Sequence, residues 1–306
     1  MVVNMKGKHL ASLHDLTKEE IWQILKTAET LKIKQKTGEK HELLYGKTLA
    51  MIFQKPSTRT RVSFEVGMKQ LGGHALYLSS TDLQLGRGET VGDTGAVLSR
   101  YCDGIMARVF SHDNIIELCK HSSVPVINGL SDLLHPCQCL ADLETILEKK
   151  QEFKGRKLAF VGDGNNVCHS LMFGSAKVGM EMSVVCPKGY EPNKEIEKLA
   201  LEDGLKLEIT NDPKKGVDGA DVIYTDVWAS MGKDKEHDDR VKVFTPYQVN
   251  EKLVSYAQDD CIVMHCLPAH RGEEITNEVV DGPHSVVLDQ AENRNHAQKA
   301  VMALLM

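Results

Sequence analysis

The sequence lacks the features that would place it in a membrane, in a secretory route or on a nucleic acid. No uninterrupted apolar run approaches the ~18 residues of a membrane-spanning helix. The first ten residues contain no apolar signal core and lack the arginine- and serine-rich character of a transit peptide. Basic residues number 37 against 43 acidic ones, and a net charge of −6 argues against a general binder of nucleic acids or membrane surfaces. We therefore expect a cytoplasmic protein with neither kind of partner.

The eight cysteines include no Cys-x-x-Cys pair, so we expect free thiols rather than disulfides or a zinc cluster. Hydrophobic residues make up 42% of the chain and charged residues 26%, which is ordinary globular composition and argues against disorder. The length of 306 residues is enough for about two domains.

Short β-rich runs alternate with helical stretches along most of the chain. The predicted strands lie at 47–53, 74–78, 104–109, 124–128, 157–161, 182–186, 205–209, 222–224, 262–265 and 286–288. This alternation predicts βαβ units and parallel sheets. We expect an α/β fold with two doubly wound parallel-sheet domains over 1–147 and 148–291, joined by interdomain helices, with a terminal helix of about 292–306 packing back on the first domain. A helix is predicted at 246–255, and the charged segment 228–242 is predicted to be a mobile loop.

The densest group of anion-binding side chains lies at residues 55–61 (Lys-Pro-Ser-Thr-Arg-Thr-Arg), between a predicted strand and a predicted helix. Ser57 or Thr58 is a candidate N-cap, which leaves backbone N–H groups free at the helix start. These donors and the helix dipole attract anions, and Arg59 offers a fork that suits phosphate oxygens. The segment is not a P-loop, because Gly-x-x-x-x-Gly-Lys-Ser/Thr is absent. It predicts a phosphate site, with a capped surface helix as the alternative.

Residues 135–138 (His-Pro-Cys-Gln) follow another predicted strand. Pro136 suits the first position of a helix, which puts His135 at the carboxyl edge of the sheet, where ligands bind in open α/β folds. There His135 can donate to a carbonyl oxygen and stabilise developing negative charge. A structural histidine is the alternative. Zinc binding is disfavoured, because Cys137 and Cys139 would lie on different faces of a helix.

Residues 161–167 (Val-Gly-Asp-Gly-Asn-Asn-Val) form a turn between a strand and a helix, as in dinucleotide-binding proteins. The third glycine of Gly-x-Gly-x-x-Gly is missing, because Val167 occupies its position, and no acidic residue closes the next strand. We favour a small polar ligand beside Asn165 and Asn166. A nicotinamide-dependent oxidoreductase and a plain tight turn are the alternatives.

Two further strand ends carry reactive side chains. Asp226 ends one predicted strand, where its carboxylate can pair with a cationic amine or serve as an ordinary turn residue. Cys266 follows another strand, either as a nucleophile without an identifiable base or as a buried thiol. Arg294 precedes the last predicted helix and offers another guanidinium.

In their order along the chain, these motifs resemble those of the aspartate/ornithine carbamoyltransferase family. Residues 56–61, 135–138 and 265–268 (His-Cys-Leu-Pro) resemble its carbamoyl-phosphate elements. Residues 226–232 (Asp-Val-Trp-Ala-Ser-Met-Gly) and 162–166 resemble the ornithine branch, as does Gln84, where aspartate enzymes have a lysine. The resemblance implies transfer of the carbamoyl group from carbamoyl phosphate to the δ-amine of L-ornithine, giving L-citrulline and phosphate in arginine metabolism. Putrescine and N-acetylornithine are the alternative acceptors.

The same resemblance implies roles for individual residues. Carbamoyl phosphate is expected to be bound by Ser57, Thr58, Arg59, Thr60, Gln84, Arg108, His135, Pro136, Cys137, Gln138, Cys266, Leu267 and Arg294. Ornithine is expected to be bound by Asn166, Asp226, Ser230 and Met231. The catalytic set is expected to be Arg59, Arg108, His135, Asp226 and Cys266. The guanidiniums expected to converge on one small dianion are Arg59, Arg61, Arg108 and Arg294.

Neither a metal nor another cofactor is expected. The resemblance also implies a homotrimer or a multiple of trimers, with the loop around Gln84 entering a neighbouring subunit's site and the reaction taking place in the cleft between the two domains. The reaction needs a neutral amine, yet an amine of pKa ~10.4 is neutral in fewer than about one molecule in a thousand at pH 7. A non-catalytic binding or structural subunit of the same family is the remaining alternative.

Overall fold

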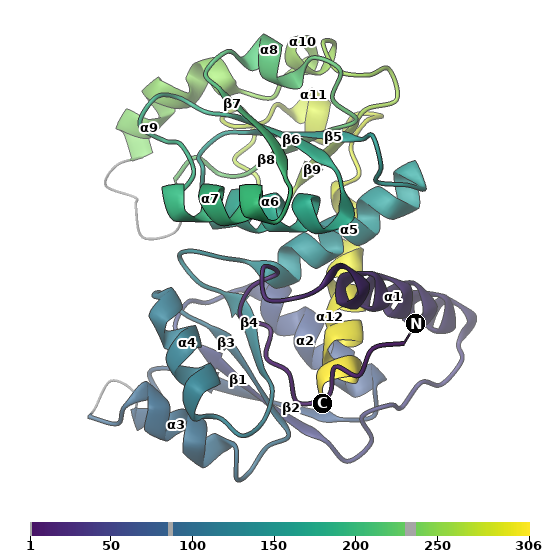
Figure 1. The fold of residues 1–306 in the computed structure, drawn as a ribbon, viewed down its shortest axis with the longest axis vertical. Helices are drawn as coiled ribbons and strands as arrows, with labels where there is room; N and C mark the ends of the chain where they lie inside the picture. Colours follow the sequence, from purple (N-terminus) through teal and green to yellow (C-terminus); the bar gives the residue numbers. More distant parts are fainter. Residues whose placement is uncertain (1, 85–87, 230–236) are drawn as a thin grey trace. The chain divides into compact units, whose positions relative to one another are not determined.

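The computed structural model describes residues 2–84, 88–229 and 237–306, and the chain divides into two compact units. Unit 1 comprises Met1–Glu144 together with Glu292–Met306, and unit 2 comprises Thr145–Ala291. Each unit contains one parallel sheet with helices beside it, which confirms the predicted α/β class (Figure 1). The chain passes from unit 1 to unit 2 within α5 (Pro136–Lys150) and returns within α12 (Val287–Leu305).

The sheet of unit 1 has the strand order β2-β1-β3-β4. Its strands are β1 (Thr48–Phe53), β2 (His74–Ser79), β3 (Gly104–Arg108) and β4 (Val126–Leu130). β1 pairs in parallel with both β2 and β3, and all its residues after Thr48 are buried. The chain passes from β1 to β2 on one side of β1, and the next strand, β3, lies on the other side of β1. The carboxyl ends of β1 and β3 therefore border a topological switch point, where open α/β sheets bind ligands.

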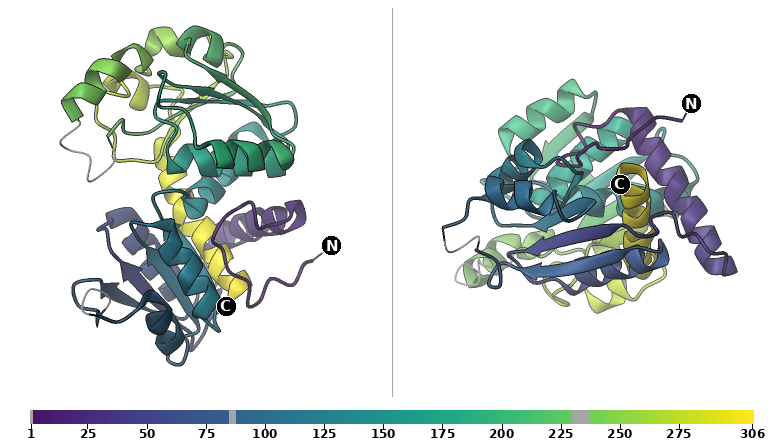
Figure 2. Two further views of the ribbon diagram at one scale, coloured as in Figure 1. Left: turned by 60° about the vertical axis from the view of Figure 1, so that its left-hand side comes forward. Right: turned by 90° about the horizontal axis from the view of Figure 1, so that it is seen from below.

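The helices of unit 1 are α1 (Lys18–Thr37), α2 (Thr58–Gln70), α3 (Val91–Leu98) and α4 (His112–His121). The C-terminal helix α12 lies beside α1 and α2 (Figures 1 and 2), and Lys32 of α1 donates to Asn293 Oδ1 at 2.7 Å. Gly67 of α2 allows the close approach, since a Cβ there would lie 2.9 Å from the side chain of Met302. The last helix thus completes the packing of the unit in which the chain begins.

The sheet of unit 2 has the strand order β7-β6-β5-β8-β9. Its strands are β5 (Lys157–Val161), β6 (Glu181–Val185), β7 (Lys206–Thr210), β8 (Val222–Thr225) and β9 (Ile262–His265). The other elements are α6 (Asn166–Val178), α7 (Lys194–Glu202), α8 (Pro213–Val217), α9 (His237–Phe244), the 3₁₀ turn η3 (Thr245–Tyr247), α10 (Glu251–Val254) and α11 (Asn277–Val280). The switch point of this sheet lies between β5 and β8, which places the turns after these strands at its ligand-binding edge.

Three sequence predictions in unit 2 are wrong. The predicted strand at 286–288 is limited to a single bridge between Ser285 and Val263, because α12 begins at Val287 and its hydrogen bonds already involve the Val286 carbonyl. The predicted helix at 246–255 is interrupted, because Val249 is extended and donates to the Glu274 carbonyl. The predicted loop at 228–242 ends early, since α9 begins at His237; residues 230–236 lie outside the described part of the chain.

All eight cysteines are free thiols, as predicted. Among the helices of the described ranges, none is both long enough and apolar enough to span a membrane.

Candidate active site

The start of α2 lies at the switch point of unit 1 and presents backbone N–H groups there. Ser57 is the N-cap in an extended conformation, and its hydroxyl accepts a hydrogen bond from the Thr60 N–H at 3.2 Å. Thr58 and Arg59 follow in the first turn, which contains no acidic residue. A helix start of this kind carries partial positive charge and favours an anion.

Two buried arginines meet at the hydroxyl of Thr60. Arg108, the last residue of β3, lies 3.4 Å through Nη1 from Thr60 Oγ1, and Arg294 of α12 lies 3.4 Å through Nη2 from the same oxygen. Arg108 and Arg294 are only 6% and 3% exposed. Two guanidiniums held beside a helix start form a forked, cationic environment that matches phosphate geometry.

His135 is buried beside these arginines and immediately precedes the first residue of α5. Burial lowers the pKa of His135 well below its usual range, and the positive charges of Arg294, Arg108 and Arg59 lower it further. The imidazole is therefore neutral at pH 7. A neutral imidazole keeps one N–H to donate and adds no charge that would repel the guanidiniums.

Gln138 connects Arg294 to the first turns of α5. Its Oε1 accepts from Arg294 Nη1 at 2.7 Å, and its Nε2 donates to Asp142 Oδ1 at 2.8 Å. The neighbouring Cys137 is buried, its thiol donates to the Asn128 carbonyl at 3.3 Å, and burial raises its pKa to about 12. Gln138 is therefore fixed in orientation, whereas the Cys137 side chain packs in the core.

Three further polar residues of unit 1 were candidates for this cluster or lie near it in the sequence: Arg61, Gln84 and Lys55. Arg61 does not converge with the others, because it pairs with Glu65 at 2.9 Å and stacks over the Tyr77 ring at 3.9 Å. Gln84 is exposed in the segment that follows β2. Lys55, which the sequence places in the segment 55–61 but to which no separate role was assigned, has a pKa lowered by burial and by the charge of Arg108. The sequence feature that could have identified Lys55 is its place two residues before Ser57, the N-cap of α2.

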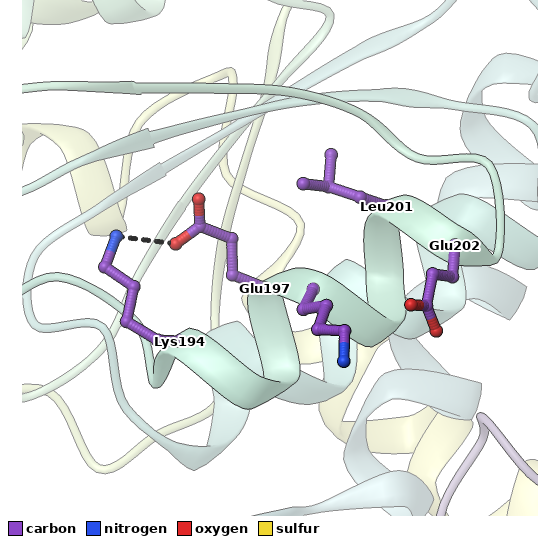
Figure 3. Close-up of a pocket in the computed structure, with 5 residues that line it drawn as sticks. Lys194, Glu197, Leu201 and Glu202 are labelled. Carbon is purple, nitrogen blue, oxygen red and sulfur yellow. Dashed lines mark hydrogen bonds and ion pairs between the residues drawn. The ribbon is translucent and has the colours of Figure 1, made fainter.

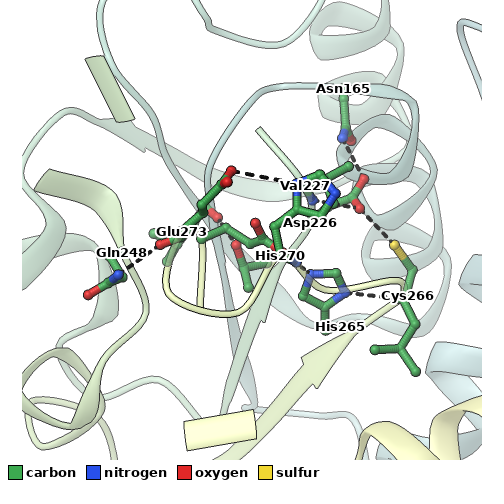
Figure 4. Close-up of polar contacts among 12 residues, drawn as sticks. Asn165, Asp226, Val227, Gln248, His265, Cys266, His270 and Glu273 are labelled. Carbon is green, nitrogen blue, oxygen red and sulfur yellow. Dashed lines mark hydrogen bonds and ion pairs between the residues drawn. The ribbon is translucent and has the colours of Figure 1, made fainter. Parts of the chain in front are cut away.

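In unit 2, Asp226 follows β8 directly and is 9% exposed. Its Oδ2 accepts from Asn165 Nδ2 at 2.7 Å, and its Oδ1 accepts from the Val227 N–H at 2.8 Å and from Cys266 Sγ at 2.9 Å (Figure 4). Residues after β5, β8 and β9 thus meet at one edge of the sheet. The three donors fix the direction of a carboxylate that can pair with an ammonium group.

Asn165 has a second task that the sequence reasoning did not assign to it. Its Oδ1 caps α6 by accepting from the N–H groups of Val167 at 3.0 Å and Cys168 at 3.1 Å. The predicted ligand Asn166 is the next residue and the first of the helix. The Asn-Asn pair was visible in the sequence, but only the structure separates the capping asparagine from its neighbour.

Behind Cys266, His265 is hydrogen-bonded through both ring nitrogens. Its Nδ1 accepts from the Leu267 N–H at 2.8 Å, so Nε2 carries the proton and donates to the buried Glu274 at 2.9 Å. Asp226, His265 and Cys266 lie close enough together to suggest a metal centre. The two ring bonds of His265 leave it no lone pair for a metal, so this group is better described as a hydrogen-bonded cluster.

Of the predicted ornithine ligands, Ser230 and Met231 lie outside the described residues. A hollow of about 440 Å³ lies away from the predicted site residues, on α7. It is lined by Lys194, Glu197 and neighbouring side chains of that helix (Figure 3). Its polar contact is the ion pair between Lys194 and Glu197 at 2.8 Å, an ordinary surface salt bridge.

Two family models match the two halves of the chain. The carbamoyl-P binding domain of aspartate/ornithine carbamoyltransferase matches residues 8–148, and the Asp/Orn binding domain matches residues 154–305. The chain belongs to the aspartate/ornithine carbamoyltransferase family.

Several similar proteins are named ornithine carbamoyltransferase. The ornithine carbamoyltransferase of Pyrococcus horikoshii is 62% identical, covering 100% of this chain and 98% of that protein. The anabolic ornithine carbamoyltransferase of Pyrococcus furiosus is 61% identical with the same coverage. Among solved carbamoyltransferase structures, that of Pyrococcus furiosus has a TM-score of 0.96 at 60% identity, covering 100% of this chain and 99% of that one. That of Thermus thermophilus has a TM-score of 0.89 at 42% identity, covering 97% and 99%.

Proposed function

We propose that this carbamoyltransferase transfers the carbamoyl group from carbamoyl phosphate to the δ-amine of L-ornithine, giving L-citrulline and phosphate in arginine metabolism. Both halves of the chain match the models of this family, and relatives of about 60% identity along the whole chain are named ornithine carbamoyltransferase. The observation that carries the chemistry is the pair of buried guanidiniums, Arg108 and Arg294, that meet at Thr60 in the first turn of α2, together with a buried His135 whose pKa is lowered by burial and by their charges.

Residues 1–147, with the helix at about 292–306, form the carbamoyl-phosphate-binding domain in this proposal. The phosphate binds at the N–H groups and hydroxyls of Ser57, Thr58 and Thr60 and is neutralised by Arg59, Arg108 and Arg294. Pro136, Cys137 and Gln138 line the carbamoyl end from the first turn of α5, with Cys137 contributing through its backbone. Cys266 and Leu267 complete the proposed set of carbamoyl-phosphate-binding residues.

His135 donates to the carbamoyl oxygen. When the amine attacks the carbonyl carbon, a C–N bond forms and the oxygen becomes negatively charged. Arg108, Thr60 and His135 stabilise that charge, and removing one such donor typically costs about 3–4 kcal/mol of transition-state stabilisation. The bond from carbon to the phosphate oxygen then breaks, and the proton lost by the attacking nitrogen passes to the leaving phosphate, which becomes HPO₄²⁻. Phosphate departs as a dianion held by the arginines.

Residues 148–291 form the ornithine-binding domain. Asp226 is an anion of fixed direction that pairs with the ammonium group of the amino acid, and Asn166, Ser230 and Met231 complete the amine side. Cys266 contacts Asp226 at 2.9 Å, so these two groups are placed to organise the neutral form of the δ-amine. We further propose a cytoplasmic homotrimer or multiple of trimers, in which Gln84 reaches a neighbouring subunit's site and no metal or other cofactor takes part.

The decisive test compares two neighbouring arginines on one helix. Arg59→Ala should reduce citrulline formation by at least about 100-fold with the fold retained, because it removes charge from the phosphate and the transition state. Arg61→Ala is the matched control and should keep near-normal kcat and KM, because Arg61 pairs with Glu65 and Tyr77 instead. Equal rates for the two variants would contradict the phosphate assignment.

An amine panel tests the acceptor. With carbamoyl phosphate present, ornithine should give the highest kcat/KM among ornithine, putrescine, N-acetylornithine and aspartate. A preference for one of the other amines would move the chain to another branch of the family. Turnover of none of them, with carbamoyl phosphate still bound, would indicate a non-catalytic member.

A further inference from the structure

A group of potential metal ligands lies outside the residues assigned to the reaction. His237, His270 and Glu273 of unit 2 each offer one ligand atom, and these three atoms lie within 4.8 Å of one another. His237 Nε2 is 3.1 Å from Glu273 Oε2, and His270 Nδ1 is 3.5 Å from the same oxygen. Two ligands of a tetrahedral zinc ion with bonds of about 2.0–2.1 Å are about 3.4 Å apart. Two of the three spacings therefore already match a bound ion.

The turn that carries two of these ligands is held firmly by hydrogen bonds. The His270 N–H donates to buried Glu274 at 2.7 Å, and the Glu273 N–H donates to the His270 carbonyl at 2.9 Å. Gln248 donates from Nε2 to the carbonyls of Gly272 and Glu273, both at 2.9 Å (Figure 4). The positions of His270 and Glu273 are thus set by groups that are not themselves ligands, as metal binding with little reorganisation requires.

The third ligand has an outer partner that orients it. His237 is the first residue of α9, and its Nδ1 lies 3.4 Å from Asp238 Oδ1 while its Nε2 faces Glu273. With the Nδ1 proton donated to Asp238, Nε2 is the nitrogen available to an ion, which would replace the proton that Nε2 now shares with Glu273 Oε2 at 3.1 Å. A carboxylate on the far nitrogen is the usual outer partner of a metal-binding histidine, because it fixes the tautomer and raises the basicity of the ring.

We propose that His237, His270 and Glu273 bind one divalent transition-metal ion, such as Zn²⁺, with water completing the coordination. Two imidazoles and one carboxylate suit zinc, cobalt and nickel better than magnesium or calcium, which prefer oxygen ligands. The three side chains are 30% to 43% exposed, so an ion can enter from solvent. Bound there, it joins the start of α9 to the turn at 270–273. That turn in turn contacts His265 through Glu274, so the ion stiffens the part of unit 2 behind Cys266 without taking part in the reaction.

Cobalt is the probe for the test, since its visible absorption reports ligand type and number. The full-length protein at about pH 8 should bind one equivalent of Co²⁺ without a thiolate charge-transfer band. Zn²⁺ should displace it. His237→Ala and Glu273→Gln should each weaken binding by at least about 100-fold, and Asp238→Asn by about 10–100-fold, the usual effect of losing an outer partner.

The matched control is His121→Ala. His121 is an exposed histidine with one carboxylate, Glu117, at 3.3 Å, and it should leave Co²⁺ binding unchanged. Circular dichroism should show all variants folded, as expected for partly exposed side chains. Unchanged affinity in both His237→Ala and Glu273→Gln would overturn the proposal, as would a thiolate band from Cys266 or no binding by the unmodified protein.

Discussion

His135 stays uncharged because of where the fold buries it, and the same physics acts on a second histidine of unit 1. His296 of α12 is buried, and burial together with the charge of Lys299 lowers its pKa to about 4, although the Glu292 carboxylate at 3.3 Å opposes the shift. Each histidine remains neutral when the protein is folded at pH 7. The neutral ring of His135 can donate a hydrogen bond to a carbonyl without adding charge. The neutral ring of His296 instead affects how the free energy of unfolding depends on pH.

The His296 term has a defined sign and pH window. Between pH 6.5 and about 4 the unfolded chain binds a proton at His296 that the folded chain does not. The free energy of unfolding should therefore fall as the pH drops, by about 1–2 kcal/mol between pH 7 and pH 5. Hydrogen exchange in α12 at the two pH values measures this loss, and His296→Gln should reduce it. His121→Gln, which alters an exposed histidine with the same i,i+4 glutamate, should not. An unchanged loss in His296→Gln would assign the acid sensitivity elsewhere.

At the scale of single elements, the two switch points explain why charged and polar side chains of the site gather at strand ends. The ends of β1 and β3 carry the cationic cluster, and the ends of β5 and β8 carry Asn165 and Asp226. Asn165 shows how closely stability and function are joined, because one amide caps a helix through its oxygen and holds a carboxylate through its nitrogen.

A pair of N-cap asparagines separates these two tasks. Asn165→Ala and Asn193→Ala each remove a cap from a helix of unit 2, α6 or α7, and each should lower stability by about 1 kcal/mol. Only Asn165→Ala also frees the Asp226 carboxylate, so only it should raise the KM for ornithine. Equal KM values at matched stability would show that the Asn165–Asp226 contact does not serve binding.

The elements also show what the sequence can predict. The bounds of β5 and β9 match the predicted runs at 157–161 and 262–265, because buried parallel strands are continuous apolar runs between polar turns. The run at 286–288 is equally apolar, but it does not form a strand. The Val286 carbonyl accepts a helical hydrogen bond from the Gln290 N–H instead of pairing with a neighbouring strand. Helix α1 was not predicted, although Thr17 and Glu20 form a capping box that marks its start.

The same contrast holds for the site. The segment around Arg59 was predicted because helix start, hydroxyls and guanidinium lie within seven residues. The orientation of Arg61 toward Glu65 and Tyr77 was not predictable, because an exposed arginine selects partners that only the folded surface supplies. Lys55 lies in the same predicted segment but was given no role of its own, since its interaction with Arg108 depends on the pairing of β1 with β3.

At the scale of the whole molecule, the proposed assembly makes a prediction about mixed subunits. If Gln84 serves a neighbouring site, Arg59→Ala and Gln84→Ala inactivate a site from different subunits. Refolding an equal mixture of the two inactive variants should give trimers in which some sites combine an intact Arg59 with an intact Gln84. Random mixing in a cyclic trimer restores about a quarter of the wild-type activity.

The control refolds each variant alone, and neither sample should regain activity. Recovery absent from the mixed sample, with size-exclusion and light scattering showing trimers, would place Gln84 in its own subunit's site or outside the site altogether. Full activity of Gln84→Ala alone would remove this residue from the reaction.

Unit 1 is discontinuous, since Glu292–Met306 belongs to it although unit 2 intervenes. During synthesis the ribosome therefore completes unit 2 before it releases the helix that packs on α1 and α2 and carries Arg294. Domains usually fold in the order in which they are made. Here the later unit is the first whose chain is complete, and the anion-binding unit stays incomplete until residues 292–306 have been made. A chain that stops before residue 292 would thus leave unit 1 incomplete, although residues 1–144 are all present.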